Sequence, residues 1–578
     1  MKEKRKLLLL LLSLCVIKLS AGAQVLFNGK QAAVDNLTGT WLVSVPETAY
    51  GADYTVAVSL DDGITQCCID GLPVDTHYTF RNVGPGISYR LTALKGSDTI
   101  QAKVQFTFWP VIQIYGDFVK RPYASGTVVY THPDSVAQET LISRVRWAGS
   151  STAEPGRQKH NFHLKFYNAD GSKKDMSFFG LRSDFHWRLD AGQIDFARVR
   201  NRVAKDIWAE FAHQPYYAAY EPKTPYNYVR GDFVEVFLND EYMGIYSLNE
   251  HMDRQQLKLK KYDYNTGTFH GGLWKPMTKT YTSLFRQLPN VNASQKDWDQ
   301  IFVKYPNLDD VNPTNFSTMY NAVKFTIESS TKRFADSAAY YFDIPVMRDY
   351  YMFLLLMQAP DNIGKNLYYA CYDVATDKRL TLAIWDWDCT QGQFWSNEPA
   401  YYHHTQVSPT YDLQNNNVFN HKMFNLLKLT DPSFHGMATD RYWELHETTF
   451  SVDSIVARYR AYFDEMKRCG ADQREITRWS GGTDLGGRPL DFDNELDYLR
   501  DWWTQHIAYL DEKVFVPYPV GDMNYDRTIN VSDAVILIGH LMNSQGDEYI
   551  WSYDVNKDGL VNVTDVIELV TKLSVEQL

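Results

Sequence analysis

The sequence predicts an α+β protein made of three successive parts. Short strand-like runs separated by turns fill residues 24–110 and indicate a small accessory β-sandwich. Residues 111–516 mix strand-like alternation with amphipathic helical spacing. Pro517-Tyr518-Pro519 marks a linker, and residues 517–578 then hold two acidic loops that each enter an apolar helix. We therefore expect a modular chain with separate cores.

The N-terminus has the features of a signal peptide. A basic start is followed by the apolar run Leu7–Ile17 and by the small residues Ala21-Gly22-Ala23. This pattern predicts cleavage of residues 1–23 and a secreted or cell-surface protein. No later apolar run is long enough to cross a bilayer, so we expect no transmembrane anchor.

Charge and cysteine usage exclude several classes of function. The net charge of −12 argues against nucleic acid as a main partner. Five cysteines follow the predicted cleavage site, an odd and sparse set that fits neither a disulfide framework nor a zinc site. These residues are Cys67, Cys68, Cys371, Cys389 and Cys469.

The middle part alternates strands and helices before one polar cluster. We expect strands at 126–132, 141–147 and 161–167, a helix at 195–211, a hairpin of 232–238 with 242–248, and an apolar helix at 348–357. The cluster follows. Asp361 and Asn366 precede a hairpin of Leu367–Cys371 and Leu380–Ile384, and Asp386 and Asp388 come after it. A hairpin places its two ends side by side, so the four polar residues can converge.

This spacing suits phosphoryl transfer. Protein kinases use a catalytic-loop Asp, an Asn five positions later and a metal-binding Asp after a short hairpin. Asp361 would then orient or deprotonate an acceptor hydroxyl, and the oxygens of Asn366 and the later acids would hold Mg²⁺. The alternative explanation is structural: Asp361 caps a turn after Pro360, and Asp386 ends a strand.

Two upstream residues fit the same order of elements. Lys165 lies on a strand before a helix, where it would contact phosphates, and Glu250 ends the second hairpin, near the hinge that would hold the nucleotide. Lys165 is equally explained as an exposed strand lysine. The loop Gly149–Lys159 is placed to cover phosphates but lacks the G-x-G-x-x-G spacing.

Several of these segments carry a family resemblance. The order of Arg144-Val-Arg-Trp147, Val234-Glu-Val-Phe-Leu-Asn239, Gly272-Leu-Trp-Lys275, Lys365-Asn366 and Trp385-Asp-Trp-Asp388 resembles the spore coat protein H (CotH) kinase-like family over residues 110 to 515. The resemblance implies an atypical kinase fold that transfers phosphate from ATP to protein Ser or Thr with Mg²⁺ or Mn²⁺. It makes Asp361 the catalytic acid and Asn366, Asp386 and Asp388 candidate metal ligands, and leaves open which of the two later acids binds metal.

The C-terminal loops have calcium-ligand spacing. Oxygen side chains occupy positions 1, 3, 5, 9 and 12, and position 7 offers its carbonyl, as Ca²⁺ requires. The first loop supplies Asp522, Asn524, Asp526, Thr528, Asn530 and Asp533; the second, 32 residues later, supplies Asp554, Asn556, Asp558, Leu560, Asn562 and Asp565. Asp at position 12 and the lack of a preceding helix resemble a type I dockerin. The resemblance implies a cohesin-bearing scaffold as partner, with Ser532 and Thr564 at the contact, and Arg527 stands where Gly is usual.

Two other functions remain open. The kinase-like part can be a non-catalytic scaffold or adhesion unit of a polysaccharide-degrading assembly. It can also be a glycoside hydrolase, with Asp386 and Asp388 as the acid pair, although no glycosidase motif is visible.

Overall fold

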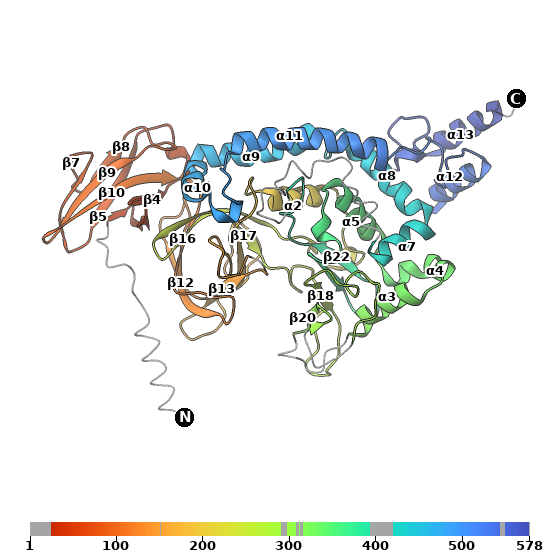
Figure 1. Cartoon of the computed structure of the whole chain (residues 1–578), viewed down its shortest axis with the longest axis horizontal. Coiled ribbons are helices and arrows are strands. Elements are labelled where there is room, and N and C mark those ends of the chain that lie inside the picture. Colours follow the sequence, from red (N-terminus) through yellow and green to blue (C-terminus); the bar gives the residue numbers. More distant parts are fainter. Residues whose placement is uncertain are drawn as a thin grey trace. The chain divides into compact units, whose positions relative to one another are not determined.

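The structure is a computed structural model that describes residues 25–150, 152–290, 297–307, 311, 316–393, 420–543 and 550–576. The predicted signal peptide lies outside these residues. The chain divides into two compact units. Unit 1 comprises residues up to Arg198, Arg230–Glu250 and Ala461–Phe492; unit 2 comprises Val199–Val229, His251–Arg460 and Asp493–Leu578. Figure 1 shows the strand-rich N-terminal half and the helices that follow. The predicted mixed α+β class is therefore confirmed, whereas the predicted domain limits stay a prediction.

Unit 1 begins with two sheets that share one apolar core. Their core includes Phe27, Phe80, Leu91 and Phe106. The first sheet has the order β2-β1-β5-β8 and comprises β1 Val25–Phe27, β2 Lys30–Gln31, β5 Tyr54–Leu60 and β8 His77–Phe80. The second has the order β3-β4-β10-β9-β6-β7 and comprises β3 Ala33–Asp35, β4 Thr40–Ser44, β6 Ile64–Ile69, β7 Leu72–Pro73, β9 Tyr89–Lys95 and β10 Asp98–Thr107.

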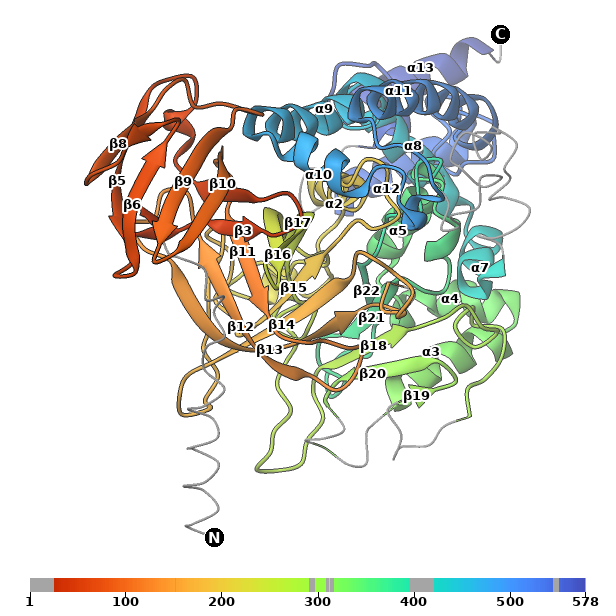
Figure 2. The same cartoon turned by 60° about the vertical axis from the view of Figure 1, so that its left-hand side comes forward.

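A seven-stranded closed barrel completes the strands of unit 1. Figure 2 shows its strands around a common axis. The order is β11-β12-β13-β14-β15-β17-β16, with β11 Val111–Tyr115, β12 Ala124–Thr131, β13 Glu139–Ala148, β14 Asn161–Tyr167, β15 His186–Asp190, β16 Gly231–Leu238 and β17 Glu241–Glu250. The predicted strands and hairpin of this region all lie in the barrel. Helix α10, Ala471–Trp479, packs on β17.

Unit 2 holds a five-stranded sheet and most of the helices. The sheet order is β19-β20-β18-β21-β22, with β18 Gly272–Pro276, β19 Asp297–Trp298, β20 Ile301–Tyr305, β21 Leu367–Cys371 and β22 Thr381–Ile384. The helices include α2 Arg200–Phe211, α3 Ser317–Glu328, α4 Thr331–Tyr341, α5 Ile344–Leu356, α7 Lys422–Thr430 and α8 Pro432–His446. Two longer helices, α9 Val452–Cys469 and α11 Phe492–Tyr509, contain residues of both units.

Two helix limits differ from the prediction for local reasons. Helix α5 begins four residues early because Pro345 occupies its first turn, where a missing N–H costs nothing. Helix α2 begins at Arg200 rather than Asp195. The Asp195 carboxylate accepts the Ala197 N–H at 2.9 Å, and Arg198 has φ +61°. This local turn replaces the first helical turn.

The C-terminal part of unit 2 consists of α12 Val531–Asn543 and α13 Val563–Glu576, each preceded by one acidic loop. A small core that includes Met523, Leu537 and Leu569 holds them together. Within the described residues, no helix combines the length and apolar character needed to cross a membrane.

Candidate functional site

Asp361 lies on the short 3₁₀ turn Pro360–Asn362 that follows α5. Its Oδ2 accepts a hydrogen bond from Asn366 Nδ2 at 2.8 Å, and its Oδ1 lies 2.7 Å from the Lys365 ammonium. The Asp361 side chain is 16% exposed, so solvent still reaches it. The two residues that sequence spacing paired are thus in direct contact, with Lys365 as an additional partner.

The hairpin brings the later acids to the same end. Leu367 of β21 pairs with Ile384 of β22. Asn362 Nδ2 donates to the carbonyls of Trp385 and Asp386, each at 3.1 Å, and so joins the Asp361 turn to the segment after β22. Asp386 has φ +61°, so the chain after β22 is not extended at this residue. Trp387 is buried and its N–H donates to Asn201 Oδ1 at 3.0 Å, which fixes the segment that carries both acids.

The electrostatics show that the acids share one neighbourhood. Burial raises the pKa of the Cys389 thiol well above its usual value, and Asp388, Asp361 and Asp386 add to the shift. Burial alone would lower the pKa of Lys365, but Asp361 and Asp386 outweigh it and the pKa is raised. Carboxylate oxygens are the kind of group that could hold a hard divalent cation here.

Sequence spacing did not single out the cations of this site. Besides Lys365, Lys279 lies near Asp361, whose charge partly offsets the lowering of the lysine pKa by burial. Lys279 comes from the loop after β18, far along the chain from the hairpin. Lys365 stood inside a quoted motif, whereas no local pattern marks Lys279.

Lys165 lies in unit 1 within a grid of basic residues. The grid spans the neighbouring strands β13, β14 and β15. One row across these strands consists of Arg144, Lys165 and His186, and a second row consists of Arg146, His163 and Arg188. These six residues, which we call the basic grid, share one face of the barrel because alternate strand residues point the same way. Burial lowers the pKa of Lys165, and Arg146, Lys173 and Arg144 lower it further.

Aromatic rings support the cations of the basic grid. Tyr123 lies under Arg146 at 4.8 Å and under Lys165 at 4.5 Å, and Tyr167 lies under Arg144 at 5.2 Å. No carboxylate of the described residues forms an ion pair with these three cations. Arg144, Arg146 and Lys165 therefore keep their positive charge.

Glu250 lies on the other face of this sheet. Leu164, Trp187 and Glu250 pair across β14, β15 and β17, and Lys165 is the residue after Leu164. Because successive strand residues point to opposite faces, Glu250 and Lys165 lie on opposite faces of the sheet. The structure does not bring the two together. The Glu250 carboxylate is fully buried, and Arg230 binds both its oxygens at 3.0 and 2.7 Å. Its contact with a nucleotide stays a prediction.

The cations of the loop Gly149–Lys159 are already engaged within unit 1. The buried Lys159 ammonium donates to Glu475 Oε1 at 2.8 Å, and Arg157 lies 3.5 Å from Asp484. Burial lowers the pKa of Lys159 to about 7. Lys159 stabilises the barrel through α10 and is not placed to bind phosphate.

The two acidic loops have the same backbone geometry. Asp522 accepts the N–H groups of Asp526 and Arg527, and Asp554 accepts those of Asp558 and Gly559. Positions 4 and 6 have positive φ in both loops, at Tyr525, Arg527, Lys557 and Gly559. The position-12 acids, Asp533 and Asp565, each accept three loop N–H groups.

The donor set fits Ca²⁺. Asp522, Asp533 and Asp565 are fully buried, and no cation of the described residues forms an ion pair with them. Burial raises the pKa of Asp522, and Asp533 and Asp526 contribute to the shift. Buried carboxylates of like charge are costly unless a cation or a proton neutralises them. The individual Ca²⁺ ligands predicted from the sequence stay a prediction.

Comparison with known proteins identifies both parts. No curated protein matches the chain. Residues 520–574 match the dockerin type I domain model, and dockerin type I domains bind calcium and interact with cohesins. Residues 145–510, more than half of the chain, match the model of the CotH kinase protein family. The two matches confirm both predicted resemblances, and the chain belongs to the CotH kinase protein family, with a type I dockerin at its C-terminal end.

Proposed function

We propose that the CotH part transfers phosphate from ATP to a Ser or Thr hydroxyl of a protein. The observation that carries this proposal is the hydrogen bond between Asp361 and Asn366 at the end of a hairpin that also delivers Asp386. A Mg²⁺ or Mn²⁺ ion held by Asn366 and by Asp386 or Asp388 would neutralise charge on the transferring phosphate. The acceptor hydroxyl would belong to a second protein.

In this proposal the chain's own residues position the acceptor. Lys365 and Asn366 hold the Asp361 carboxylate in one orientation. The oxygen of the acceptor hydroxyl forms the new bond to the γ-phosphorus, and Asp361 accepts the proton of that hydroxyl. The bond between the γ-phosphorus and the bridging oxygen breaks, and ADP leaves. Lys165 has a supporting role: it lies beside Arg144 on one face of the barrel and over the Tyr123 ring, and such a basic face favours contact with phosphate groups.

Phosphate labelling tests the Asp361 assignment. The full chain, supplied with radiolabelled ATP, Mg²⁺ or Mn²⁺ and a protein acceptor, should incorporate label. Asp361→Asn should lower the rate by about 10²–10⁴-fold, the usual contribution of a general base. Asp377→Asn is the matched control, because Asp377 belongs to the far turn of the hairpin and pairs with Arg379 at 2.6 Å. Equal labelling by wild type and Asp361→Asn would refute the assignment.

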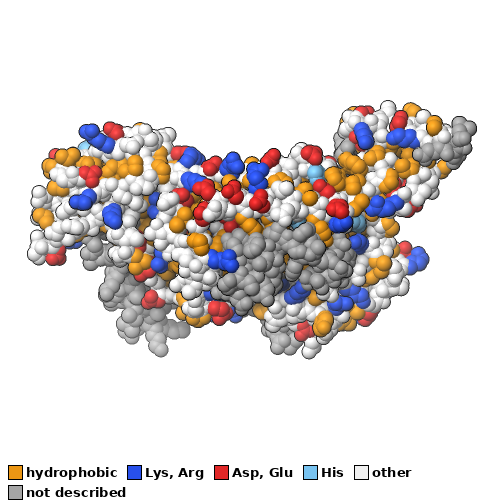
Figure 3. All heavy atoms as spheres, turned by 45° about the horizontal axis from the view of Figure 1, so that its top comes forward, with side chains coloured by type: hydrophobic (Ala, Val, Ile, Leu, Met, Phe, Trp, Pro, Cys, Tyr) orange, Lys and Arg blue, Asp and Glu red, His pale blue; other side chains and the backbone are white. Residues whose placement is uncertain are grey.

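We propose that the dockerin attaches the enzyme to a cohesin-bearing scaffold outside the cell. An exposed apolar face supports this. Val531, Val535 and Ile538 of α12 recur 32 residues later as Val563, Ile567 and Val570 of α13, and all six are exposed. Figure 3 displays apolar side chains on this C-terminal part, at the upper right. Ser532 and Thr564 adjoin the face and would contact the cohesin.

Binding measurements separate the enzyme from a scaffold. Calorimetry of the full chain should register heat with ATP and a divalent cation. A chain that gives no heat with any nucleotide but binds a wall polymer or glycan would instead be a non-catalytic component of the assembly.

A further inference from the structure

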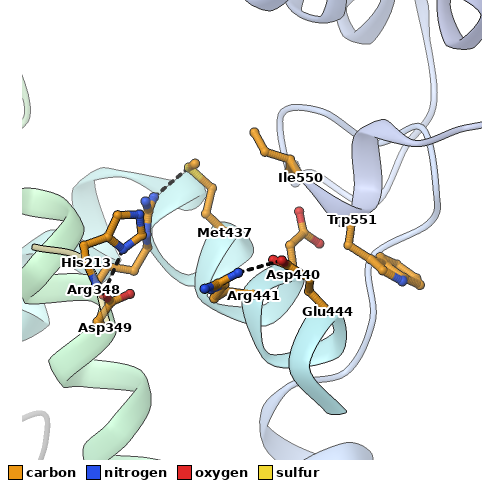
Figure 4. Close-up of a pocket in the computed structure, with 9 residues that line it drawn as sticks. All are labelled: His213, Arg348, Asp349, Met437, Asp440, Arg441, Glu444, Ile550 and Trp551. Atoms are coloured by element: carbon orange, nitrogen blue, oxygen red, sulfur yellow. Dashed lines mark hydrogen bonds and ion pairs between the residues drawn. The ribbon is translucent and has the colours of Figure 1, made fainter. Parts of the chain in front are cut away.

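Helix α8 of the CotH part contacts the dockerin through one buried acid. Asp440 is 2% exposed. Its Oδ2 accepts the Tyr525 hydroxyl at 2.8 Å and the Ser552 hydroxyl at 2.6 Å. Figure 4 shows Asp440 facing the segment that carries Ile550 and Trp551, across a pocket bordered by Met437 and Glu444. Both hydrogen bonds come from dockerin residues, so α8 recognises the folded dockerin rather than a linker.

The fit around Tyr525 is tight. A Cβ atom at Gly436 would lie 2.2 Å from the Tyr525 ring, which shows that the ring lies directly against the glycine, one helical turn before Asp440. Met437 packs against the apolar core of the dockerin. A single glycine of α8 thus provides the space that the dockerin tyrosine occupies.

Tyr525 also belongs to the first calcium loop. It stands between two ligand positions, Asn524 and Asp526, with φ +59°. Lys557 is the equivalent residue of the second loop and has φ +61°, but it is exposed. The loops share one backbone geometry. Helix α8 holds Tyr525 inside the first loop, whereas it reaches the second loop's side through Ser552, two residues before Asp554.

We propose that α8 is an internal docking site that raises the Ca²⁺ affinity of the first loop. Gly436 and Asp440 hold Tyr525 in the left-handed conformation that also places its two neighbours as ligands. Any contact that favours the ligand-binding geometry of the loop must favour Ca²⁺ binding, and Ca²⁺ must in turn favour the contact. This coupling compensates for Arg527, which stands where the second loop has Gly559.

Calcium calorimetry on the full chain tests the coupling with a change made outside the dockerin. Gly436→Ala pushes the Tyr525 ring away and touches no calcium ligand. We expect one of the two binding events to weaken about fivefold or more, within the usual range of coupling between sites, and the other to stay unchanged. Tyr525→Phe removes only the hydroxyl and should weaken the same event to a smaller degree.

One control variant completes the design. Gly539→Ala adds a methyl group to α12 where nothing lies within 4 Å. It should leave both affinities unchanged. If Gly436→Ala and Tyr525→Phe keep the wild-type circular dichroism and bind both Ca²⁺ ions as tightly as wild type or more tightly, the proposal is wrong. The readout is independent of phosphate transfer, so the proposed enzymatic activity can fail without affecting it.

Discussion

The Asp361 cluster and the dockerin loops both gather oxygen ligands, but they handle charge differently. In the hairpin cluster, Lys365 pairs with Asp361 at 2.7 Å and compensates its charge. In the loops, the buried acids Asp522, Asp533 and Asp565 have no such cation among the described residues. We therefore expect the loops to depend on a bound ion for stability, whereas the hairpin cluster can fold with its acid neutralised by Lys365.

The largest expected effect comes from removing one position-12 acid. Asp533→Ala deletes a ligand and leaves the N–H groups of Met523, Asn524 and Asn530 without their acceptor. We expect Ca²⁺ affinity at the first loop to fall about 100-fold or more, since even partners of metal ligands contribute about 10- to 100-fold. Calorimetry measures this loss, and chelation of wild type should likewise lower dockerin helicity by circular dichroism.

A nearby acid controls for charge. Glu568→Ala removes a partly exposed carboxylate of α13 that lies 3.8 Å from Lys572 and holds no loop. It should leave Ca²⁺ affinity unchanged. A chelated dockerin that keeps its full helicity would show that the loops do not depend on the ion, and the contrast with the hairpin cluster would disappear.

A smaller effect tests how the hairpin cluster is held. Gly392 follows Asp386 and Asp388 and has φ +80°. A Cβ atom added to it would lie 2.2 Å from the Tyr498 hydroxyl and 2.7 Å from the Trp502 ring. Gly392→Ala should destabilise the chain by about 2–4 kcal/mol, from overpacking and left-handed strain together. Thermal unfolding measures it.

Gly481→Ala separates the two causes. Gly481 has φ +75°, and a Cβ added there would have nothing within 4 Å, so this variant reports strain alone, about 1–2 kcal/mol. Equal losses in the two variants would mean that α11 does not hold the acid segment in place.

The same contrast explains what could be predicted from the sequence. Each calcium loop carries all its predicted ligands within twelve residues, and its repeat adds a second copy, so spacing alone was enough to predict every ligand position. The Asp361–Asn366 contact was also predictable, because one hairpin joins both ends. Lys279 and Asn201 were not, since only tertiary packing brings them to the site. Glu250 shows the opposite difficulty: the order of elements suggested its place, but strand register and Arg230 decide which way it faces.

The smallest expected effect distinguishes the two calcium loops themselves. Arg527 has φ +67°, where Gly559 stands in the second loop, and a side chain in the left-handed region costs about 1–2 kcal/mol. Arg527→Gly removes this strain and a positive charge beside the ion, and both changes favour binding. The variant keeps the backbone N–H that donates to Asp522. It loses the contact of the arginine with the Tyr518 ring at 4.6 Å, which is worth about 0.5–1 kcal/mol. Ca²⁺ affinity at the first loop should therefore rise about two- to fivefold, the net of these terms, and Gly559→Arg should weaken the second loop. Weaker binding by Arg527→Gly would mean that the Tyr518 contact outweighs the strain.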